Sequence, residues 1–549
     1  MYLAFPLRFV YDINGRIAEV RSTKQFVWHL CIKKKPNSLM EDTMMEYSME
    51  MKQKYLGIPV YAEEQEEMLE IFDGGEKIFE FQVPVCQDGT GRKCDYYSYL
   101  NIEKYRGRTL VLRGNLPEGF FGEICQTDSY AQEPLTRPLI HFTAQRGWIN
   151  DPNGLVYHNG RYHLFFQYNP MNTRWQNMSW GHAIGKDLLH FEQVEDALYP
   201  DEHGTMYSGC GLVNERGMLN LPKNALLFYY TAAGGMNEWS KGKEFTQRIA
   251  YSTDEGETLV KLPEEAVGVI EQDSRDPKIF WHEETQAYIM VLWLCGNKFG
   301  FLRSENLKEW NMTDSIELAE AWECPDLFCL ECGGEPVWVF MSADGFYYLG
   351  QFDGYHFRTD GVQKKAYITG LPYAAQTYSG TADRIISVPW LRTHNAGKLY
   401  TGMMGLPREL HLEKRGEDIR LALLPVREYE ETKETAAEFA LGGEGFSLET
   451  AEDAVTEIVL EPSECKNISM KFFHQELAIR DRMIFCKEER TSLPEEIKDI
   501  HILIDRGVLE IYANNGTLNV YYETDSDVLR GKIEIKGGKG TGKICTWKP

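Results

Sequence analysis

The chain has 549 residues and carries 58 Lys and Arg against 83 Asp and Glu, a formal net charge of −25 at pH 7. At about 150 residues per domain, this length predicts three or four domains. A hydrophobic fraction of 43% is that of a folded globular protein and excludes wholesale disorder. The acidic excess argues against nucleic acid or an anionic membrane as a partner, because both attract Lys and Arg.

The sequence also lacks the marks of a membrane or exported protein. No window approaches the roughly 18 uninterrupted apolar residues of a membrane helix. The apolar run at the N-terminus is interrupted by Arg8 and Asp12 and is followed by no small-residue cleavage site. We therefore expect a cytoplasmic protein whose 12 cysteines are free thiols.

One cysteine spacing bears on metal binding. Cys324, Cys329 and Cys332 have the C-x4-C-x2-C spacing of part of a plant-type iron–sulfur loop. The next cysteine is Cys465, and the intervening Pro-Asp-Leu-Phe is typical of the start of a buried strand. The segment after His282 lacks the second His of a zinc helix. We predict buried thiols, no metal and no cofactor.

Residues 1–135 predict a β-rich accessory domain. Segments 79–85, 96–100 and 109–113 alternate like the strands of a small sandwich. Residues 37–68 are rich in Met, Glu and Lys and predict a helical insertion. Polymer binding, dimer support and packing against the next domain are all open roles, with packing favoured.

Residues 136–428 consist of short strand-like runs separated by Gly, Asn and Asp turns. In the clearest hairpin, Asn159 and Gly160 supply the positive-φ positions of a type I′ turn. Many short antiparallel strands require a propeller, barrel or sandwich to manage their edges. A polar linker or short helix at 428–437 then leads to a second β block, residues 429–549.

Three acidic residues occupy unusual local settings. Asp151 and Asp276 each precede a proline, which denies them the helical region of backbone space. Glu323 stands among Trp, Cys, Pro, Leu and Phe, so partial burial would raise its pKa as a general acid requires. Taken singly, each is better explained as a turn or strand-end residue. Together they supply what glycoside cleavage needs: a nucleophile, a proton donor and a carboxylate that binds hydroxyls.

These residues lie in segments that resemble glycoside hydrolase family 32, which holds invertases, levanases and inulinases. The three signatures are Trp-Ile-Asn-Asp-Pro-Asn-Gly at 148–154, Arg-Asp-Pro at 275–277 and Glu-Cys-Pro-Asp at 323–326. Further similar segments stand in the family's order at 166–170, 175, 177–182, 207–209, 373–376, 406–410, 504–506 and 515–516. The resemblance spans residues 136–549.

The resemblance implies an all-β fold: a five-bladed β-propeller over 136–428, followed by a β-sandwich over 429–549. It makes Asp151 the nucleophile, Glu323 the acid/base and Asp276 the binder of fructosyl hydroxyls. The residues that it places around the fructose pocket are Asn150, Gln167, Trp175, Tyr207, Ser208, Arg275 and Trp390. It also allows a homodimer formed through the sandwich.

The function that follows is a retaining β-fructofuranosidase acting on fructans, fructo-oligosaccharides or sucrose. One alternative is a fructosyltransferase with the same machinery, in which a sugar hydroxyl replaces water. The other is a catalytically silent carbohydrate-binding propeller, because propellers also host lectins. The nucleophile–acid pair argues against the silent alternative, since binding alone needs neither group.

Overall fold

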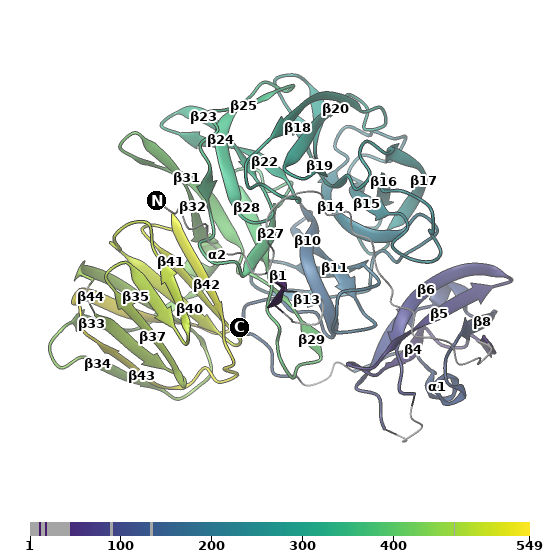
Figure 1. Ribbon diagram of the computed structural model, residues 1–549, viewed down its shortest axis with the longest axis horizontal. Helices are drawn as coiled ribbons and strands as arrows, with labels where there is room; N and C mark the ends of the chain where they lie inside the picture. Colours follow the sequence, from purple (N-terminus) through teal and green to yellow (C-terminus); the bar gives the residue numbers. More distant parts are fainter. Residues whose placement is uncertain (1–9, 12–16, 19–43, 88–91, 132–134, 466) are drawn as a thin grey trace. The chain divides into compact units, whose positions relative to one another are not determined.

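A computed structural model describes residues 10–11, 17–18, 44–87, 92–131, 135–465 and 467–549. The chain divides into two compact units, Met1–Thr43 and Met44–Pro549. In the first unit, strands β1 (Val10–Tyr11) and β2 (Ile17–Ala18) pair antiparallel. In the second unit, the regular secondary structure of the described residues is almost entirely β-strand (Figure 1).

The N-terminal part of this unit is a small two-sheet domain. Its strands, in sheet order, are β3 (Met45–Glu50), β8 (Thr109–Gly114), β5 (Glu66–Asp73) and β6 (Glu76–Pro84) in one sheet, and β7 (Tyr96–Asn101), β4 (Tyr55–Val60) and β9 (Cys125–Thr127) in the other. Buried side chains from both sheets, with those of the short helix α1 (Glu118–Glu123), form one apolar core. The strands predicted at 79–85, 96–100 and 109–113 correspond to β6, β7 and β8.

The helical insertion predicted near residues 37–68 is wrong over its described part. Residues 37–43 lie outside the described residues, and 44–68 form β3, β4 and the start of β5. Every residue of β4 is buried, and Leu56 and Ile58 lie in the domain core. Helix propensities differ by only about 0.7 kcal/mol per ordinary residue, so strand pairing and burial outweighed the local preference of Met, Glu and Lys.

The middle of the chain forms five antiparallel sheets whose main strands follow each other in sequence order, the blades of a propeller. Their strands are β10 (Gly147–His158), β11 (Arg161–Asn169), β12 (Ser179–Gly185) and β13 (Phe191–Gln193) in the first blade; β14 (Thr205–Val213), β15 (Leu226–Ala233), β16 (Thr246–Ser252) and β17 (Val260–Val267) in the second; β18 (Arg275–His282), β19 (Ala287–Cys295), β20 (Lys298–Ser304) and β21 (Asn311–Glu317) in the third; β22 (Asp326–Cys332), β23 (Glu335–Met341), β24 (Phe346–Phe352), β25 (Phe357–Thr359) and β26 (Lys364–Lys365) in the fourth; and β27 (Pro372–Thr377), β28 (Ile386–Leu391), β30 (Met403–Met404), β31 (Arg408–Arg415) and β32 (Asp418–Pro425) in the fifth.

The ring of blades closes on its first strands. Strand β10 contacts β14 on one side and β27 on the other, and β29 (Tyr400–Thr401) pairs with the start of β10 in parallel. Figure 1 shows β10, β14, β22 and β27 near the middle of the propeller, while later strands such as β17 and β25 lie farther out. Strand β14 also contacts β18. The first residues of five strands that are distant in sequence therefore meet in one region.

A buried polar contact ties three of these inner strands together. Lys278 Nζ of β18 lies 3.1 Å from Asp326 Oδ2 of β22 and donates to the Thr377 carbonyl of β27 at 2.6 Å. The Thr377 main-chain N–H donates to Asp326 Oδ2 at 2.7 Å. Because all three side chains are buried, the pair is compensated by hydrogen bonds as a buried charge requires.

The C-terminal part consists of two six-stranded antiparallel sheets around one apolar core. Their strands, in sheet order, are β33 (Glu434–Leu441), β44 (Lys539–Trp547), β35 (Val455–Glu464), β40 (Ile500–Asp505), β41 (Val508–Ala513) and β42 (Leu518–Glu523), and β34 (Phe446–Thr450), β43 (Gly531–Lys536), β36 (Ile468–Phe472), β37 (Gln475–Arg480), β38 (Met483–Cys486) and β39 (Glu489–Ser492). Helix α2 (Arg427–Thr432) stands where the sequence predicts a linker or short helix.

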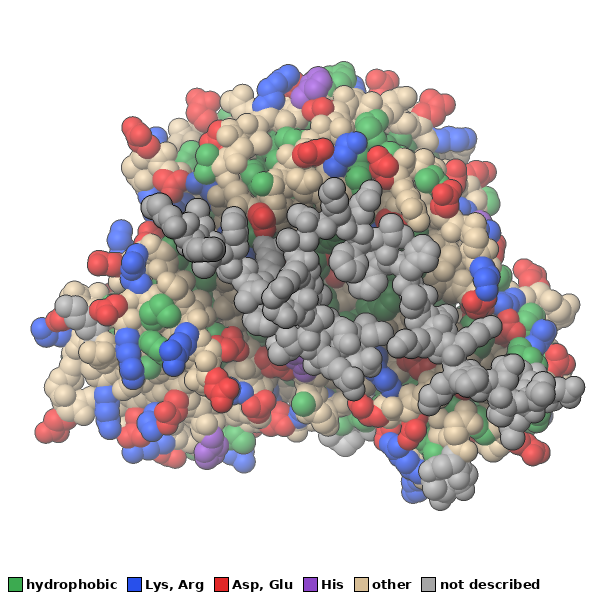
Figure 2. Space-filling view, in the orientation of Figure 1, with side chains coloured by type: hydrophobic (Ala, Val, Ile, Leu, Met, Phe, Trp, Pro, Cys, Tyr) green, Lys and Arg blue, Asp and Glu red, His purple; other side chains and the backbone are tan. Residues whose placement is uncertain are grey.

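Two further features concern the charges on the surface and the length of the helices. Acidic and basic side chains are interspersed over the described part of the face in Figure 2. In the part of the chain that the structure describes, no helix is long and apolar enough to span a membrane.

A buried charge network joins the propeller to the sandwich. His141, just before the first blade, places Nδ1 2.8 Å from Asp505 Oδ2 and Nε2 3.0 Å from Glu510 Oε1. Arg408 of the fifth blade also pairs with Glu510. Burial alone would lower the pKa of His141, but its hydrogen bonds to Asp505 and Glu510 raise that pKa to about 9. The imidazolium is therefore the partner that both buried carboxylates require.

We expect His141→Gln to lower the free energy of unfolding by about 3–5 kcal/mol, because it leaves a buried carboxylate without its charged partner. The pKa of His141 is raised in the folded state, so its stabilisation is complete below about pH 6.5 and is lost as pH rises through about 9. Thermal and denaturant unfolding measured from pH 6 to 10 test both points. The exposed His411→Gln is the matched control and is expected to leave stability and its pH dependence unchanged. Equal stability of the two variants would contradict the network's role.

Candidate active site

The candidate site lies where four of the inner strands are interrupted by β-bulges. The register between the first and second strand of a blade shifts at Ile149/Pro152 in β10, Met206/Gly209 in β14, Arg275/Lys278 in β18 and Tyr373/Gln376 in β27. Asp151, Ser208 and Asp276 fall within these shifts. A bulge leaves a residue out of the ladder and re-aims its side chain, which turns these groups out of regular strand positions.

The backbone is also strained at this place. Asp276 has φ 65°, Glu323 has φ 27°, Cys324 has φ 43° and Ala374 has φ 48°. Positive φ is uncommon for residues other than Gly and costs about 1–3 kcal/mol at each position. Four such residues in one cluster indicate a geometry that the surrounding blades impose for function.

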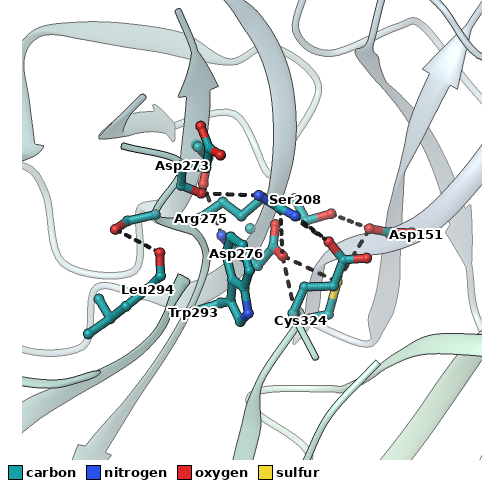
Figure 3. Close-up of polar contacts among 12 residues, drawn as sticks. Asp151, Ser208, Asp273, Arg275, Asp276, Trp293, Leu294 and Cys324 are labelled. Carbon is teal, nitrogen blue, oxygen red and sulfur yellow. Dashed lines mark hydrogen bonds and ion pairs between the residues drawn. The ribbon is translucent and has the colours of Figure 1, made fainter. Parts of the chain in front are cut away.

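Asp151 is held by a chain of side-chain amides and a hydroxyl. Ser208 Oγ donates to Asp151 Oδ2 at 2.6 Å (Figure 3). Asn150 Nδ2 donates to Asp151 Oδ1 at 3.2 Å. Gln167 lies behind both, accepting from Asn150 Nδ2 at 3.1 Å and donating to Ser208 Oγ at 2.8 Å. Burial raises the pKa of Asp151, the Ser208 hydrogen bond opposes the rise, and the charge of Glu323 adds to it.

Asp276 lies in β18 of the third blade and is buried. Its main-chain N–H donates to Thr231 Oγ1 at 3.0 Å, and its Oδ2 accepts the Cys324 main-chain N–H at 3.1 Å. Arg275 Nε lies 3.7 Å from the same oxygen. Burial raises the pKa of Asp276, and the Arg275 guanidinium opposes that rise.

Glu323 stands just before β22 and receives donors from two other blades. Arg275 Nη2 donates to Glu323 Oε2 at 2.7 Å, and the Tyr373 hydroxyl donates to Oε1 at 2.5 Å. The Arg275 guanidinium in turn lies over the Trp293 ring, 3.9 Å from its centroid. The Glu323 side chain is about one-fifth exposed, so it retains access to solvent.

One thiol links the three carboxyl groups in space. Cys324 Sγ lies 3.5 Å from Asp151 Oδ2 and 3.5 Å from Asp276 Oδ2, and Cys324 directly follows Glu323 in the chain. A small cavity is lined by Asp151, Asp276 and Cys324 together. Figure 3 shows Asp151, Ser208, Asp276 and Cys324 converging from separate segments of the chain. The nucleophile, hydroxyl binder and acid/base predicted from the sequence therefore share one site.

The predicted aromatic residues lie around this cluster. Trp175 is 43% exposed and packs edge-on to Tyr207, with 6.3 Å between ring centroids. Trp390 contacts Trp148 and Tyr373 in the same way, at 5.8 and 6.2 Å. Flat apolar rings next to hydrogen-bonding groups suit the two faces of a sugar.

Two residues of the cluster were not among the predicted site residues. Tyr373 and Cys324 both stand in segments whose resemblance to the family was noted, yet no local pattern marks their contacts. Tyr373 pairs in register just before the bulge of β27 and donates to Glu323, and only the ring of blades brings these two residues together. Within the described residues, no group of three or more His, Cys, Asp or Glu is placed to hold a metal ion.

The sequence matches a family model, glycosyl hydrolases family 32 N-terminal domain, over residues 141–423. The chain belongs to glycoside hydrolase family 32.

Similar proteins include a levanase and an exo-inulinase. The levanase of Bacillus subtilis (strain 168) is 35% identical over 342 residues, which is 56% of this chain and 49% of that protein. The extracellular exo-inulinase inuE of Aspergillus niger (strain ATCC MYA-4892 / CBS 513.88 / FGSC A1513) is 31% identical over 50% of this chain and 62% of its own length. The chain thus spans about half to two thirds of the length of these relatives.

Solved family 32 structures confirm the predicted fold class, a β-propeller followed by a β-sandwich. The exo-inulinase of Aspergillus awamori superposes with a TM-score of 0.66 at 22% identity, covering 76% of this chain and 99% of that one. A family 32 protein of Bifidobacterium adolescentis superposes with a TM-score of 0.63 at 19% identity and covers 92% of this chain and 99% of its own.

We expect Ser208→Ala to shift the acidic limb of the kcat/KM pH profile to higher pH. The Ser208 hydroxyl favours the charged form of Asp151, so its removal raises the pKa of Asp151 further and leaves less ionised carboxylate at low pH. Activity measured between pH 4 and 8 tests this shift. Ser252→Ala, which removes another buried hydroxyl from β16 of the second blade, is the matched control. An acidic limb that stays in place in Ser208→Ala would contradict the assigned contact.

Proposed function

We propose that this family 32 protein is a retaining β-fructofuranosidase that releases terminal β-D-fructosyl units from fructans, fructo-oligosaccharides or sucrose. The observation that carries the proposal is the convergence of Asp151, Asp276 and Glu323, from three blades, on one strained and hydrogen-bonded cluster. The activities of the named levanase and exo-inulinase relatives support the substrate class.

Asp151 is the proposed nucleophile. Its carboxylate attacks the anomeric carbon of fructose and forms a covalent fructosyl–enzyme intermediate. This role requires the ionised form, and the hydrogen bonds from Ser208 and Asn150 favour that form against the effect of burial. Gln167 hydrogen-bonds to both Ser208 and Asn150 and so fixes the orientation of these two donors.

Glu323 is the proposed acid/base. It protonates the departing oxygen as the glycosidic bond breaks, and the carboxylate it leaves behind meets the Arg275 guanidinium and the Tyr373 hydroxyl. It then takes a proton from the water that attacks the intermediate, and fructose leaves with retained configuration. Its partial exposure gives that water a path to the site.

Asp276 is proposed to hold the hydroxyls of the fructosyl unit. The bond cleavage passes through a state with oxocarbenium character, and positive charge on the ring strengthens hydrogen bonds to a carboxylate. Its contribution therefore belongs more to the transition state than to ground-state affinity. Trp175, Tyr207 and Trp390 supply the apolar sides of the pocket.

We expect Asp151→Asn and Glu323→Gln each to lower kcat by about 10²–10⁴-fold or more while leaving the thermal unfolding midpoint within a few degrees of wild type. Both changes keep the side-chain shape and remove the reactive carboxylate. Initial rates on sucrose and levan, with unfolding followed in parallel, measure the two effects. Near-wild-type rates in either variant would remove the assignment.

Product analysis separates the proposed activity from its alternatives. Sucrose, kestose, inulin and levan are offered, and the anomer first released is read by NMR together with the chain lengths of the products. Hydrolysis gives free fructose of retained configuration, whereas transfer gives longer oligosaccharides at high sucrose. Binding without release of any sugar would favour the silent carbohydrate-binding alternative and reject the proposal.

A further inference from the structure

Two loops border the candidate site from the first and second blades. Residues 170–178 connect β11 to β12, and the end of β11 pairs with the start of β10 through Asn169 and Trp148. Residues 234–245 connect β15 to β16, and Thr231 near the end of β15 accepts the main-chain N–H of Asp276. Both loops therefore leave the blades at the end of the propeller where the carboxylates meet. We call residues 170–178 the first rim loop and residues 234–245 the second rim loop.

The first rim loop is joined to the N-terminal domain by a side chain that imitates a strand. The Gln82 main-chain N–H in β6 donates to Asn177 Oδ1 at 2.7 Å, and Asn177 Nδ2 donates back to the Gln82 carbonyl at 2.8 Å. Asn177 is buried and has φ 50°, a conformation that Asn tolerates better than most residues. Met171 of the same loop is fully buried within the apolar core of the N-terminal domain.

The second rim loop is held by the same strand. The Trp239 main-chain N–H donates to Glu80 Oε1 of β6 at 3.0 Å. Lys77 Nζ lies 2.6 Å from Glu80 Oε2 and 5.5 Å from the centroid of the Trp239 ring. Glu80 is almost fully buried, so its two contacts replace the water that a carboxylate would otherwise bind.

Aromatic contacts connect both rim loops to the proposed fructose pocket. Trp175 lies in the first rim loop, and its exposed ring packs against Tyr207. Tyr207 also contacts Phe245, at the end of the second rim loop, with 5.5 Å between ring centroids. Ser208, the next residue, donates to Asp151. Each loop thus places an aromatic ring against Tyr207, whose neighbour in the chain contacts the nucleophile.

We infer that the N-terminal domain is a positioning element of the active site: through Asn177 and Glu80, its strand β6 fixes the rim loops that carry Trp175 and Phe245. The inference rests on the proposed function, because Trp175 is taken as part of the fructose pocket. Asn177 and Glu80 are positioning residues and touch no substrate themselves.

The physical reason is the cost of ordering exposed loops. A loop that is not braced must lose conformational freedom when substrate binds, and this loss weakens binding without changing the reacting groups. A loop held by paired hydrogen bonds and a buried Met has lost that freedom on folding. Loosening the brace therefore acts mainly on KM, while Asp151 and Glu323 keep their own contacts and preserve kcat.

The test uses the full chain with Asn177→Asp and Glu80→Ala. The first variant keeps the acceptor for the Gln82 N–H and replaces the donor to the Gln82 carbonyl with an oxygen that repels it. The second removes the acceptor for Trp239. Lys54→Met is the matched control, because the Lys54–Glu195 pair, 2.9 Å apart, joins the same two domains outside both rim loops.

Hydrogen exchange followed by mass spectrometry is the first measurement. We expect faster exchange in peptides covering residues 170–178 in Asn177→Asp and residues 234–245 in Glu80→Ala, and wild-type exchange there in Lys54→Met. Unchanged exchange in both loop variants would overturn the inference. Equal acceleration in Lys54→Met would overturn it too, because the effect would then come from general loosening of the domain.

Steady-state kinetics on sucrose and a short fructan is the second measurement. We expect KM to rise about tenfold or more in both loop variants, with kcat within about twofold of wild type and an unchanged pH profile. A fall in kcat with constant KM would reject positioning of the pocket. Inactivity of the wild type on every fructoside would instead overturn the proposed function, and the exchange comparison would still decide whether β6 braces the loops.

Discussion

The constraint on which the site depends is the mutual repulsion of three carboxyl groups brought into one small volume. Asp151, Asp276 and Glu323 come from different blades; Asp276 is buried, and the other two are only partly exposed. Like charges in such a place drive protonation unless donors and cations are arranged around them. The Arg275 guanidinium compensates part of this negative charge, because it pairs with Glu323 and lies beside Asp276. Hydrogen-bond donors stabilise the carboxylates further.

The propeller brings these groups together through β-bulges that interrupt its inner strands. A regular strand points successive side chains to opposite faces, so a carboxylate and its donor on adjacent residues could not both face the centre. The bulges in β10, β14, β18 and β27 remove that restriction, and positive φ at Asp276 and Glu323 re-aims their side chains. Below this distorted layer, the Lys278–Asp326–Thr377 contact ties regular strands of three blades. The undistorted part of the ring stabilises the strained part.

Sequence reasoning succeeds where the determinant is local. The Asn159-Gly160 hairpin follows from the need for two positive φ values, and the structure has 48° and 78° there. Strands in the N-terminal domain followed from alternation. The helix expected near 37–68 was wrong over residues 44–68 because its strands are stabilised by partners far away in the chain, such as the pairing of β3 with β8.

The same distinction separates the site residues that could be predicted from those that could not. Asp151, Asp276 and Glu323 stand in segments that resemble the family's signatures, so the resemblance named them, although each alone is better explained as a turn or strand-end residue. The contact of Tyr373 with Glu323 bridges 50 residues and depends on two adjacent blades. Nothing in the neighbourhood of either residue specifies that distance. Contacts of this kind become visible only when the ring is closed.

The brace between β6 and Asn177 shows a further limit, which has a physical origin. Asn177 recognises the main chain of Gln82 and not its side chain. Any sequence that keeps β6 as a strand can present the same N–H and carbonyl, so selection at this contact leaves no residue pattern within the N-terminal domain. The one residue that must be specified lies across the boundary, in the propeller loop, where an amide side chain at positive φ is required. At this contact the domain can therefore diverge in sequence while β6 continues to hold the first rim loop, whereas the contact with the second rim loop requires the Glu80 side chain.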